Sequence, residues 1–378
     1  MTTEISDLTE LAYEGGEPLS TTPVLGAPSG SPSAHLTASA ERVRDGEIRV
    51  TVLGSGDPFV KSSQACASLL IEVGNPQRDL FFFDLGSGAV ANYTGLALPV
   101  TAATKVFLTH LHADHVGDMP TMVWSMAKAG RRDLVEVWGP GGETPELGTR
   151  AYTEHLAAAH AWDMSSLRGH PGQSGAQMEV SEVPWDRTAT VYDRNGVQVS
   201  SFPVIHIING AVGYRLDYNG RSVVFSGDTR PCHPLIDACD GADLLVHETF
   251  PSAPVFAQKA GVPLGFAEQV VNGAHTSPTA AGRVFARAGA RMSVMWHLAV
   301  DHQVVGPAYA DMRTQYDGPV TIAQDLTTFD LSAESIVTRQ SIIDPAAWPV
   351  LGPTTVTGPP MSPPPEPPAW WAGALLTD

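Results

Sequence analysis

Three histidines and an aspartate lie within one short stretch of the chain, THLHADHVGD, residues 109–118. The preceding run, KVFLT, is typical of a strand, and an apolar helical pattern begins near Val116. Side chains on a short loop converge when a strand fixes the base of that loop. Imidazole and carboxylate together suit zinc or a similar first-row ion, and this spacing can present ligands to two ions. The stretch therefore predicts a metal site, with the candidate ligands His110, His112, Asp114 and His115.

Short runs with strand character dominate the middle of the chain, first in hairpin-like groups and then in alternation with helical patterns. This order predicts mixed sheets covered by helices, hence an α/β or α+β layered domain. The helical patterns fall at about 116–130, 146–161, 278–288 and 307–316. The two ends are rich in Pro, Ser, Thr and Gly and lack apolar periodicity. We therefore expect a flexible N-terminal arm over 1–45, a catalytic domain over 46–343 and a Pro-rich tail over 344–378.

The charge balance disfavours a nucleic-acid partner. The 378 residues include 22 Lys and Arg against 40 Asp and Glu, a formal net charge of −18, whereas nucleic-acid binding depends on phosphate neutralisation by basic side chains. We expect a small anionic substrate. The three cysteines imply no disulfide framework, the N-terminus lacks a signal-peptide pattern, and no apolar run is long enough to span a membrane. These features predict a cytoplasmic enzyme without a membrane partner.

The string His-x-His-x-Asp-His resembles the metallo-β-lactamase superfamily. The resemblance implies an αββα sandwich with two metal ions at the shared edge of its two sheets. It also implies further ligands at strand ends, namely His206 in FPVIHI, Asp228 in SGDT and His297 in MSVMWHL. The implied arrangement is His110, His112 and His206 on one ion, Asp114, His115 and His297 on the other, and Asp228 between them. The implied cofactors are two Zn²⁺ ions, with Mn²⁺ or Fe as the alternative.

Further motifs look like one branch of that superfamily, the ribonuclease Z-like and arylsulfatase-like hydrolases. They are LGSGDP, FDLGSG, GYRL, SGDT, HETF and the segment 275–297. True β-lactamases of the fold lack a bridging Asp at the position of Asp228, so its presence favours phosphorus or sulfur esters over lactams. The diiron oxidoreductases of the fold carry Glu where this chain has His112, which favours zinc hydrolysis over redox chemistry.

Ribonuclease Z itself is disfavoured on one count. Those enzymes bind tRNA with a basic arm between the equivalents of His206 and Asp228. Here the two residues are only 22 positions apart, and the basic residues between them are Arg215 and Arg221. The predicted function is therefore a dinuclear zinc-dependent hydrolase that uses a metal-bridging hydroxide on a small phosphodiester or sulfate ester. The alternatives are a β-lactam, lactone or amide hydrolase in the same site, tRNA 3′-processing, and a non-hydrolytic metal protein.

A leaving group that is unstable as an anion must receive a proton as it departs. The first candidate donor is His275, from its place in a His-Thr loop; the other interpretation is that His275 caps the helix at 278–288. The second candidate is the pair His247 and Glu248, in which Glu248 would orient a histidine and His247 is equally well a core residue. Asp228 completes the predicted catalytic set.

Three weaker expectations complete the analysis. Asp84 would accept a hydrogen bond from a ligand histidine or form a turn. The region 140–195 would form part of the pocket wall, and its histidines would lie at the surface. A homodimer is possible, with Trp370 and Trp371 of the tail as a contact.

Overall fold

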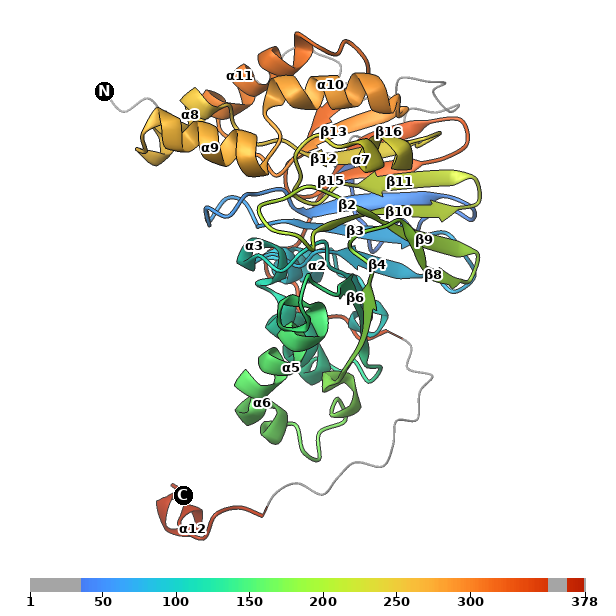
Figure 1. The fold of residues 1–378 in the computed structure, drawn as a ribbon. Helices are drawn as coiled ribbons and strands as arrows, with labels where there is room; N and C mark the ends of the chain where they lie inside the picture. The colour runs from blue at the N-terminus through green and yellow to red at the C-terminus, as the bar shows by residue number, and fades with distance from the viewer. Residues whose placement is uncertain (1–34, 353–365, 377–378) are drawn as a thin grey trace, which may run out of the picture.

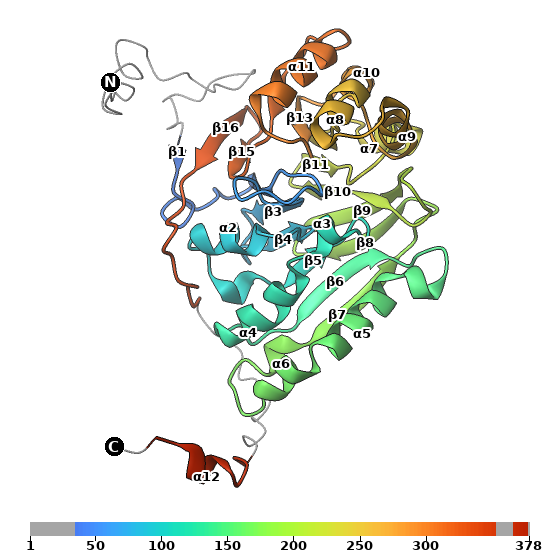
Figure 2. The ribbon, with the colours of Figure 1, turned by 90° about the vertical axis from the view of Figure 1, so that its left-hand side faces the viewer.

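The described residues, 35–352 and 366–376, form two β-sheets that pack face to face, with helices on the outer faces, in the computed structural model of the chain (Figures 1 and 2). This confirms the predicted αββα sandwich. Among these residues the larger sheet has nine strands, in the spatial order β1 (His35–Leu36), β16 (Ile336–Ser341), β15 (Thr327–Leu331), β2 (Ile48–Gly54), β3 (Ser68–Val73), β4 (Leu80–Phe83), β5 (Lys105–Phe107), β6 (Val135–Pro140) and β7 (Met178–Val183). The smaller sheet has seven, in the order β14 (Val320–Ile322), β13 (Met292–Trp296), β12 (Leu244–Glu248), β11 (Arg221–Phe225), β10 (Val212–Tyr218), β9 (Val197–Pro203) and β8 (Ala189–Arg194).

Each sheet has a parallel part, and these parts set the position of the site. Strands β4 to β7 run parallel in the larger sheet, and β11 to β14 run parallel in the smaller one. The carboxyl ends of parallel strands share one edge of a sheet, and loops that follow them meet there. The histidine-rich stretch follows β5, and further candidate residues follow β11 and β13.

The inner core consists of aromatic and branched side chains from both sheets. Phe83 of β4 stacks on Phe107 of β5, with ring centroids 5.1 Å apart, and both contact Tyr214 of β10. The neighbouring Phe82 points to the other face of the same strand and packs against Tyr93. Because β4 is buried on both faces, its sequence is continuously apolar rather than alternating.

Helices cover the two outer faces. The helices of the first half of the chain are α2 (Ala89–Gly95), α3 (Ala113–Val116), α4 (Met126–Lys128), α5 (Thr149–Ala159) and α6 (Ala161–Ser166), with the short turns η1 (Val100–Ala102), η2 (Thr121–Ser125, a π-helix), η3 (Pro145–Leu147) and η4 (Ser174–Ala176). Those of the second half are α7 (His233–Ala238), α8 (Ala253–Ala260), α9 (Leu264–Ala274), α10 (Pro278–Ala288), α11 (His302–Arg313) and α12 (Trp371–Ala374). None of the described helices combines the length and the apolar character needed to cross a bilayer.

Helix boundaries follow capping residues. The helix expected at 278–288 is confirmed as α10, where the Ser277 side chain accepts a hydrogen bond from the Ala280 N–H and Gly289 ends the helix in the left-handed region. The start expected at 307 was wrong. Helix α11 already begins at His302, because the Asp301 carboxylate accepts hydrogen bonds from two N–H groups of its first turn, and Pro307 lies inside it.

The pattern at 116–130 is not one regular helix. The turn α3 begins at Ala113, earlier than expected, so Asp114 and His115 lie in this turn rather than in a loop. A π-helical segment then separates α3 from α4. Gly130, expected to end the pattern, has a φ of 114°.

The predicted arm and tail lie partly outside the described residues. Within the described part of the arm, β1 pairs with β16, and Leu36 is buried. In the described part of the tail, Trp370 and Trp371 are exposed and contact each other, with ring centroids 6.2 Å apart. The domain bounds and the homodimer stay predictions.

One buried carboxylate stands apart from the metal site. Glu72 of β3 is 7% exposed, and its Oε2 has no hydrogen-bond partner among the described residues. The opposite residue on β2, Arg49, donates instead to Asp330 Oδ1 at 2.7 Å and to the Glu41 carbonyl at 2.6 Å. Burial therefore raises the pKa of Glu72 to about 7, although the Arg49 charge opposes the shift.

Glu72→Gln is expected to change how stability depends on pH. Because the folded-state pKa lies above the ordinary value of 4.5, the contribution of Glu72 is fully present below pH 4.5 and is lost as the pH rises through about 7. The free energy of unfolding of the wild type, minus that of the variant, should fall by about 3 kcal/mol between pH 4.5 and 9. Urea unfolding of both proteins in the same metal state measures this difference. Glu179→Gln, on the exposed edge strand β7, controls for the loss of one charge. A difference that does not vary with pH would contradict the assignment.

Candidate metal centre

All seven side chains expected to bind metal lie together at the edge where the carboxyl ends of the parallel strands meet. They are held by four separate segments. His110, His112, Asp114 and His115 follow β5, His206 follows β9, Asp228 follows β11, and His297 follows β13 directly. The structure places them in two groups of four that share Asp228, and within each group the candidate ligand atoms lie within 4.8 Å of one another.

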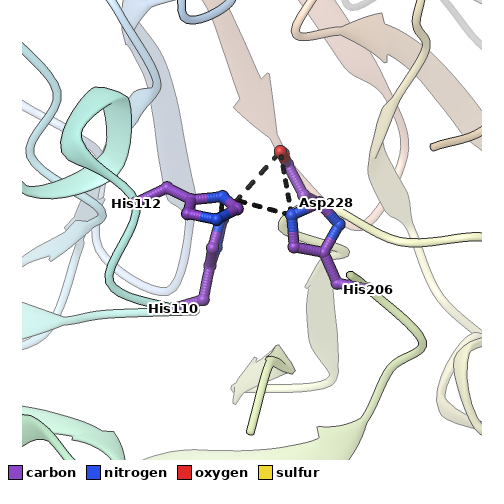
Figure 3. Close-up of side chains that lie close together, drawn as sticks. All are labelled: His110, His112, His206 and Asp228. Carbon is purple, nitrogen blue, oxygen red and sulfur yellow. Dashed lines mark hydrogen bonds and ion pairs between the residues drawn. The ribbon is translucent and has the colours of Figure 1, made fainter. Parts of the chain in front are cut away.

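The first group joins three imidazoles to one carboxylate (Figure 3). His112 Nδ1 lies 3.0 Å from His110 Nε2 and 3.2 Å from His206 Nε2. Asp228 Oδ2 lies 4.0 Å from His110 Nε2 and 3.9 Å from His206 Nε2. His112 is the exposed member of the group. Three nitrogen atoms and one oxygen atom thus face a common point.

The second group is buried and contains two carboxylates. His297 Nε2 lies 3.1 Å from Asp114 Oδ2 and 3.5 Å from Asp228 Oδ1. His115 Nε2 lies 3.2 Å from Asp228 Oδ1 and 3.5 Å from Asp114 Oδ2. Asp228 therefore turns one oxygen toward each group, as a residue between two ions would do.

The position of Asp228 depends on the glycine before it. Gly227 has a φ of 57°, and a Cβ atom there would lie 2.6 Å from the Cβ of Thr109. A larger residue would therefore be strained in its backbone and would collide with the strand end that carries the histidine loop. The glycine-permitted turn expected in SGDT is present.

Hydrogen bonds behind the cluster orient its imidazoles. Asp84 accepts from the Thr109 N–H and hydroxyl, both at 2.8 Å, and its Oδ2 lies 2.7 Å from His115 Nδ1. The sequence left open whether Asp84 acts as an acceptor or forms a turn. In the structure Asp84 acts as the acceptor. Its backbone is in the left-handed region, with a φ of 59°. His297 also has a positive φ, of 61°. Such conformations in residues other than glycine gather at functional sites.

The two groups differ in the proton affinity of their imidazoles. Burial lowers the pKa of His110 well below its ordinary value, and it lowers the pKa of His206 to about 4. In the second group burial opposes the charged form too, but carboxylates outweigh it. They raise the pKa of His115 well above its usual range and that of His297 to about 9. Burial favours the neutral form of Asp228, yet His297 and His115 hold its pKa well below the usual range.

The residues fit a pair of divalent cations. His115 Nε2 and Asp228 Oδ1 are both buried and lack a hydrogen-bond partner among the described residues. Buried polar atoms normally have partners, and two such atoms facing each other are what a bound cation satisfies. Five imidazoles and two carboxylates, without a thiolate, are a donor set that suits Zn²⁺ and related first-row ions.

A second pair of titratable groups lies beside the cluster. His275 Nδ1 is 3.0 Å from Glu248 Oε2 and 3.9 Å from Asp228 Oδ2, and its ring stacks on Phe250 at 4.4 Å. The cap of α10 is Ser277, so the interpretation of His275 as that cap was wrong. Burial opposes the charge on His275, but Glu248 outweighs it and raises the pKa of His275 above its ordinary value.

His247 does not reach the cluster. Successive residues of a strand point to opposite faces, so Glu248 faces the metal ligands while His247 faces α10. Its ring contacts Phe285 at 6.0 Å, and its Nδ1 contacts the Glu248 carbonyl. The prediction of His247 as a catalytic residue is corrected by this geometry, because the residue belongs to the core.

A cavity of about 490 Å³ opens beside the first group and is lined by His110, His112 and His206. Part of its wall comes from η3 and α5, as expected of the region 140–195, through Leu147, Tyr152 and Leu156. His155, which is exposed as expected, also lines it. A further part of the wall, formed by the loop after His206, was missed, since INGA carries no signal beyond its turn-forming residues.

Comparison with known proteins agrees with this geometry. The family model of the beta-lactamase superfamily domain matches residues 96–298. A ribonuclease Z of Mycobacterium avium (strain 104) is 30% identical over 295 residues, which cover 76% of this chain and 100% of that protein. A ribonuclease Z of Mycobacterium marinum is 28% identical over 296 residues, 76% of this chain and 99% of that protein.

Solved structures show the same fold. The metallo-beta-lactamase fold protein YhfI from Bacillus subtilis is 19% identical with a TM-score of 0.56, over 76% of this chain and 100% of that one. The short form of human tRNase Z is 18% identical with a TM-score of 0.54, and the match covers 75% of this chain and 98% of that one. Zn²⁺-bound PqqB from Methylobacterium extorquens is 14% identical with a TM-score of 0.53, and the match covers 75% of this chain and 100% of that one. With the family match and the 30% identical relative, these findings establish that the chain belongs to the metallo-β-lactamase superfamily, as a ribonuclease Z-like hydrolase.

Proposed function

We propose that the chain is a dinuclear zinc-dependent hydrolase of small anionic esters, either phosphodiesters or sulfate esters. The observation that carries this proposal is the position of Asp228. Its two oxygens face two separate ligand groups, at 3.9 and 4.0 Å on one side and at 3.2 and 3.5 Å on the other. A shared carboxylate at this position is the feature that, by the resemblance seen in the sequence, separates ester hydrolases of the fold from its β-lactamases.

The ligand groups would hold one cation each. His110, His112 and His206 would hold the first, Asp114, His115 and His297 the second, and Asp228 both. When bound, such a pair of ions supplies Lewis-acid activation of water and charge stabilisation at the reacting centre. Zinc is favoured over Mn²⁺ by the imidazole-rich donor set and over Fe by His112, which stands where the diiron oxidoreductases of the fold carry Glu. The similar PqqB structure is described as Zn²⁺-bound.

The dyad of Glu248 and His275 would hold the proton for the leaving group. Nδ1–H of His275 donates to Glu248, which leaves Nε2 as the nitrogen that can protonate a leaving oxygen. Glu248 is itself fixed by the Thr229 N–H and by a hydrogen bond from its own N–H to Ser226 Oγ at 3.0 Å. The raised pKa of His275 keeps more of it protonated at neutral pH than an ordinary histidine.

The relatives named ribonuclease Z make tRNA 3′-processing the second candidate. The interval between His206 and Asp228 argues against it, because this interval consists of a short loop, β10, the tight turn at Gly220 and β11. No inserted basic arm fits within these described residues. The net charge of −18 offers little compensation for RNA phosphates.

A substrate panel with metal analysis on one preparation tests the proposal. We expect two zinc ions per chain, and faster hydrolysis of bis(4-nitrophenyl) phosphate or 4-nitrophenyl sulfate than of a lactone, a cephalosporin or a precursor tRNA. The readouts are elemental analysis and kcat/KM for each substrate. Preferred cleavage of the cephalosporin or of the tRNA would overturn the proposal in favour of the corresponding alternative.

Asp84→Asn is expected to weaken zinc binding. The amide cannot accept from the Thr109 donors and His115 at once as the carboxylate does, so the imidazole is less firmly oriented. Loss of such a supporting contact typically lowers metal affinity 10- to 100-fold. Competition with a chelator measures the change. Asp118→Asn is the matched control, since Asp118 binds the N–H groups of Gly88 and Val90 and no ligand histidine. Equal affinities for the Asp84 variant and the wild type would refute the role.

His275→Gln is expected to lower kcat by about 10²- to 10⁴-fold on dibenzyl phosphate, whose leaving alkoxide needs a proton. On bis(4-nitrophenyl) phosphate, whose phenolate leaves unprotonated, the loss should be below about tenfold. Steady-state kinetics on both substrates gives the ratio. Equal losses on both substrates would show that His275 acts only through the structure of the site.

A further inference from the structure

The cavity beside the first ligand group has a chemical character that the metal site does not explain. Its volume is about 490 Å³, within the usual range of small-molecule sites. Three of its lining residues, His110, His112 and His206, are candidate ligands, so whatever fills it touches the reacting centre. The remaining walls are formed by η3, α5 and the loop at 208–211.

These walls are apolar and carry no positive charge. Leu111, Leu147, Tyr152, Leu156 and Ile208 line the cavity, and none of its lining residues is a Lys or Arg. Its titratable residues beyond the ligands are Tyr152, which is half-buried, and Glu146 and His155, which are both exposed. Sites that bind a second anionic group usually supply Arg or Lys for it, and this lining supplies neither.

Two of the wall residues remain exposed to solvent. Leu147 is 49% exposed and Ile208 is 61% exposed. Both belong to segments outside the sheets. Exposed apolar side chains around a concave site are typical of a ligand-contacting surface.

One lining residue, His206, has its ring centroid 5.2 Å from that of the candidate proton donor, His275. His275 itself does not line the cavity. It follows α9 and stacks on Phe250, in the part of the molecule that carries α8 and α9. Figures 1 and 2 show α5 and the α8–α9 pair on opposite sides of the segment that holds α3. A leaving group directed toward His275 would therefore lie toward the α8–α9 side, whereas the cavity is lined by α5.

We propose that the cavity binds an uncharged apolar group, alkyl or aryl, on the non-leaving side of the ester. This inference rests on the proposed function and adds the substrate class to it. Burial of the apolar group would supply the specificity. Each added methylene should raise kcat/KM roughly fourfold if it is completely buried and about twofold if it is half buried. A nucleic-acid strand, which would bring a further phosphate into this cavity without Lys or Arg, fits poorly.

A homologous series tests the proposal on the zinc-loaded full chain. The substrates are methyl, butyl and hexyl 4-nitrophenyl phosphate, which share one leaving group, and thymidine 5′-(4-nitrophenyl phosphate). We expect kcat/KM to rise at least about eightfold from methyl to butyl, that is, about twofold for each of three methylenes. A flat or falling series, or faster cleavage of the thymidine ester than of the butyl ester, would overturn the proposal.

Two neighbouring isoleucines provide a matched pair of variants. Ile208 lines the cavity, whereas Ile207, 64% exposed on the same loop, does not. Ile208→Asn should lower kcat/KM for the butyl ester at least about threefold and leave the methyl ester within twofold. Ile207→Asn should leave the ratio of the two esters unchanged. Equal losses on both esters in the Ile208 variant, or the same change of ratio in both variants, would count against the cavity as the apolar subsite.

Binding without turnover separates this inference from the proposed function. Titration calorimetry of the zinc-loaded protein with methylphosphonate and butylphosphonate should show tighter binding of butylphosphonate, and Ile208→Asn should reduce that preference. If none of the esters is hydrolysed but the preference is found, the proposed function fails and the apolar site stands. If esters are hydrolysed but the two phosphonates bind equally, the apolar site fails and the proposed function stands.

Discussion

A single buried carboxylate, that of Asp228, holds this site together electrostatically. It lies at 2% exposure within 4 Å of five imidazoles that arise from four separate segments of the chain. A charge so deeply buried is tolerable only when it is compensated by nearby positive charge or by metal coordination. The carboxylate raises the pKa of His115 well above its usual range and contributes to raising that of His297 to about 9, and the proposed cations would supply the compensating charge instead. The two-sheet scaffold exists, in functional terms, to bring these donors to one carboxylate.

The supporting residues convert that convergence into a defined geometry. Asp84 fixes His115, the Ala274 carbonyl fixes His206 through a 2.9 Å contact with Nδ1, and Gly227 lets the Asp228 loop approach Thr109. The left-handed conformations of Asp84 and His297 persist because both residues are completely buried and surrounded by packed side chains. The site thus combines a rigid, charge-dense centre with a cavity on one side that is apolar and open. The charge-dense centre bears on the type of bond that is cleaved, whereas the apolar cavity bears on the choice of substrate.

The similarity to ribonuclease Z and the apolar cavity concern different parts of the molecule. The relatedness covers about three quarters of the chain and fixes the fold and the hydrolase class. Substrate choice depends on the segments that surround the ligands, here α5 and the loop after His206. These segments can change without disturbing the sheets, because they lie outside both sheets and contribute little to the inner core.

Much of the site was predictable because its residues have local signatures. The loop from His110 to His115 is recognisable by spacing alone, and His206, Asp228 and His297 by their places after strands once the resemblance is known. The sequence could not decide between His247 and Glu248, since adjacent strand residues face opposite sides and the face depends on the packing of β12. It also missed the early start of α11, the π-helical segment and the cavity wall at Ile208. The sequence by itself determined which donors are available and at which strand ends they lie. The tertiary structure decided which atoms meet, because contacts such as that between Asp114 and His297, 183 positions apart, depend on strand register and sheet packing.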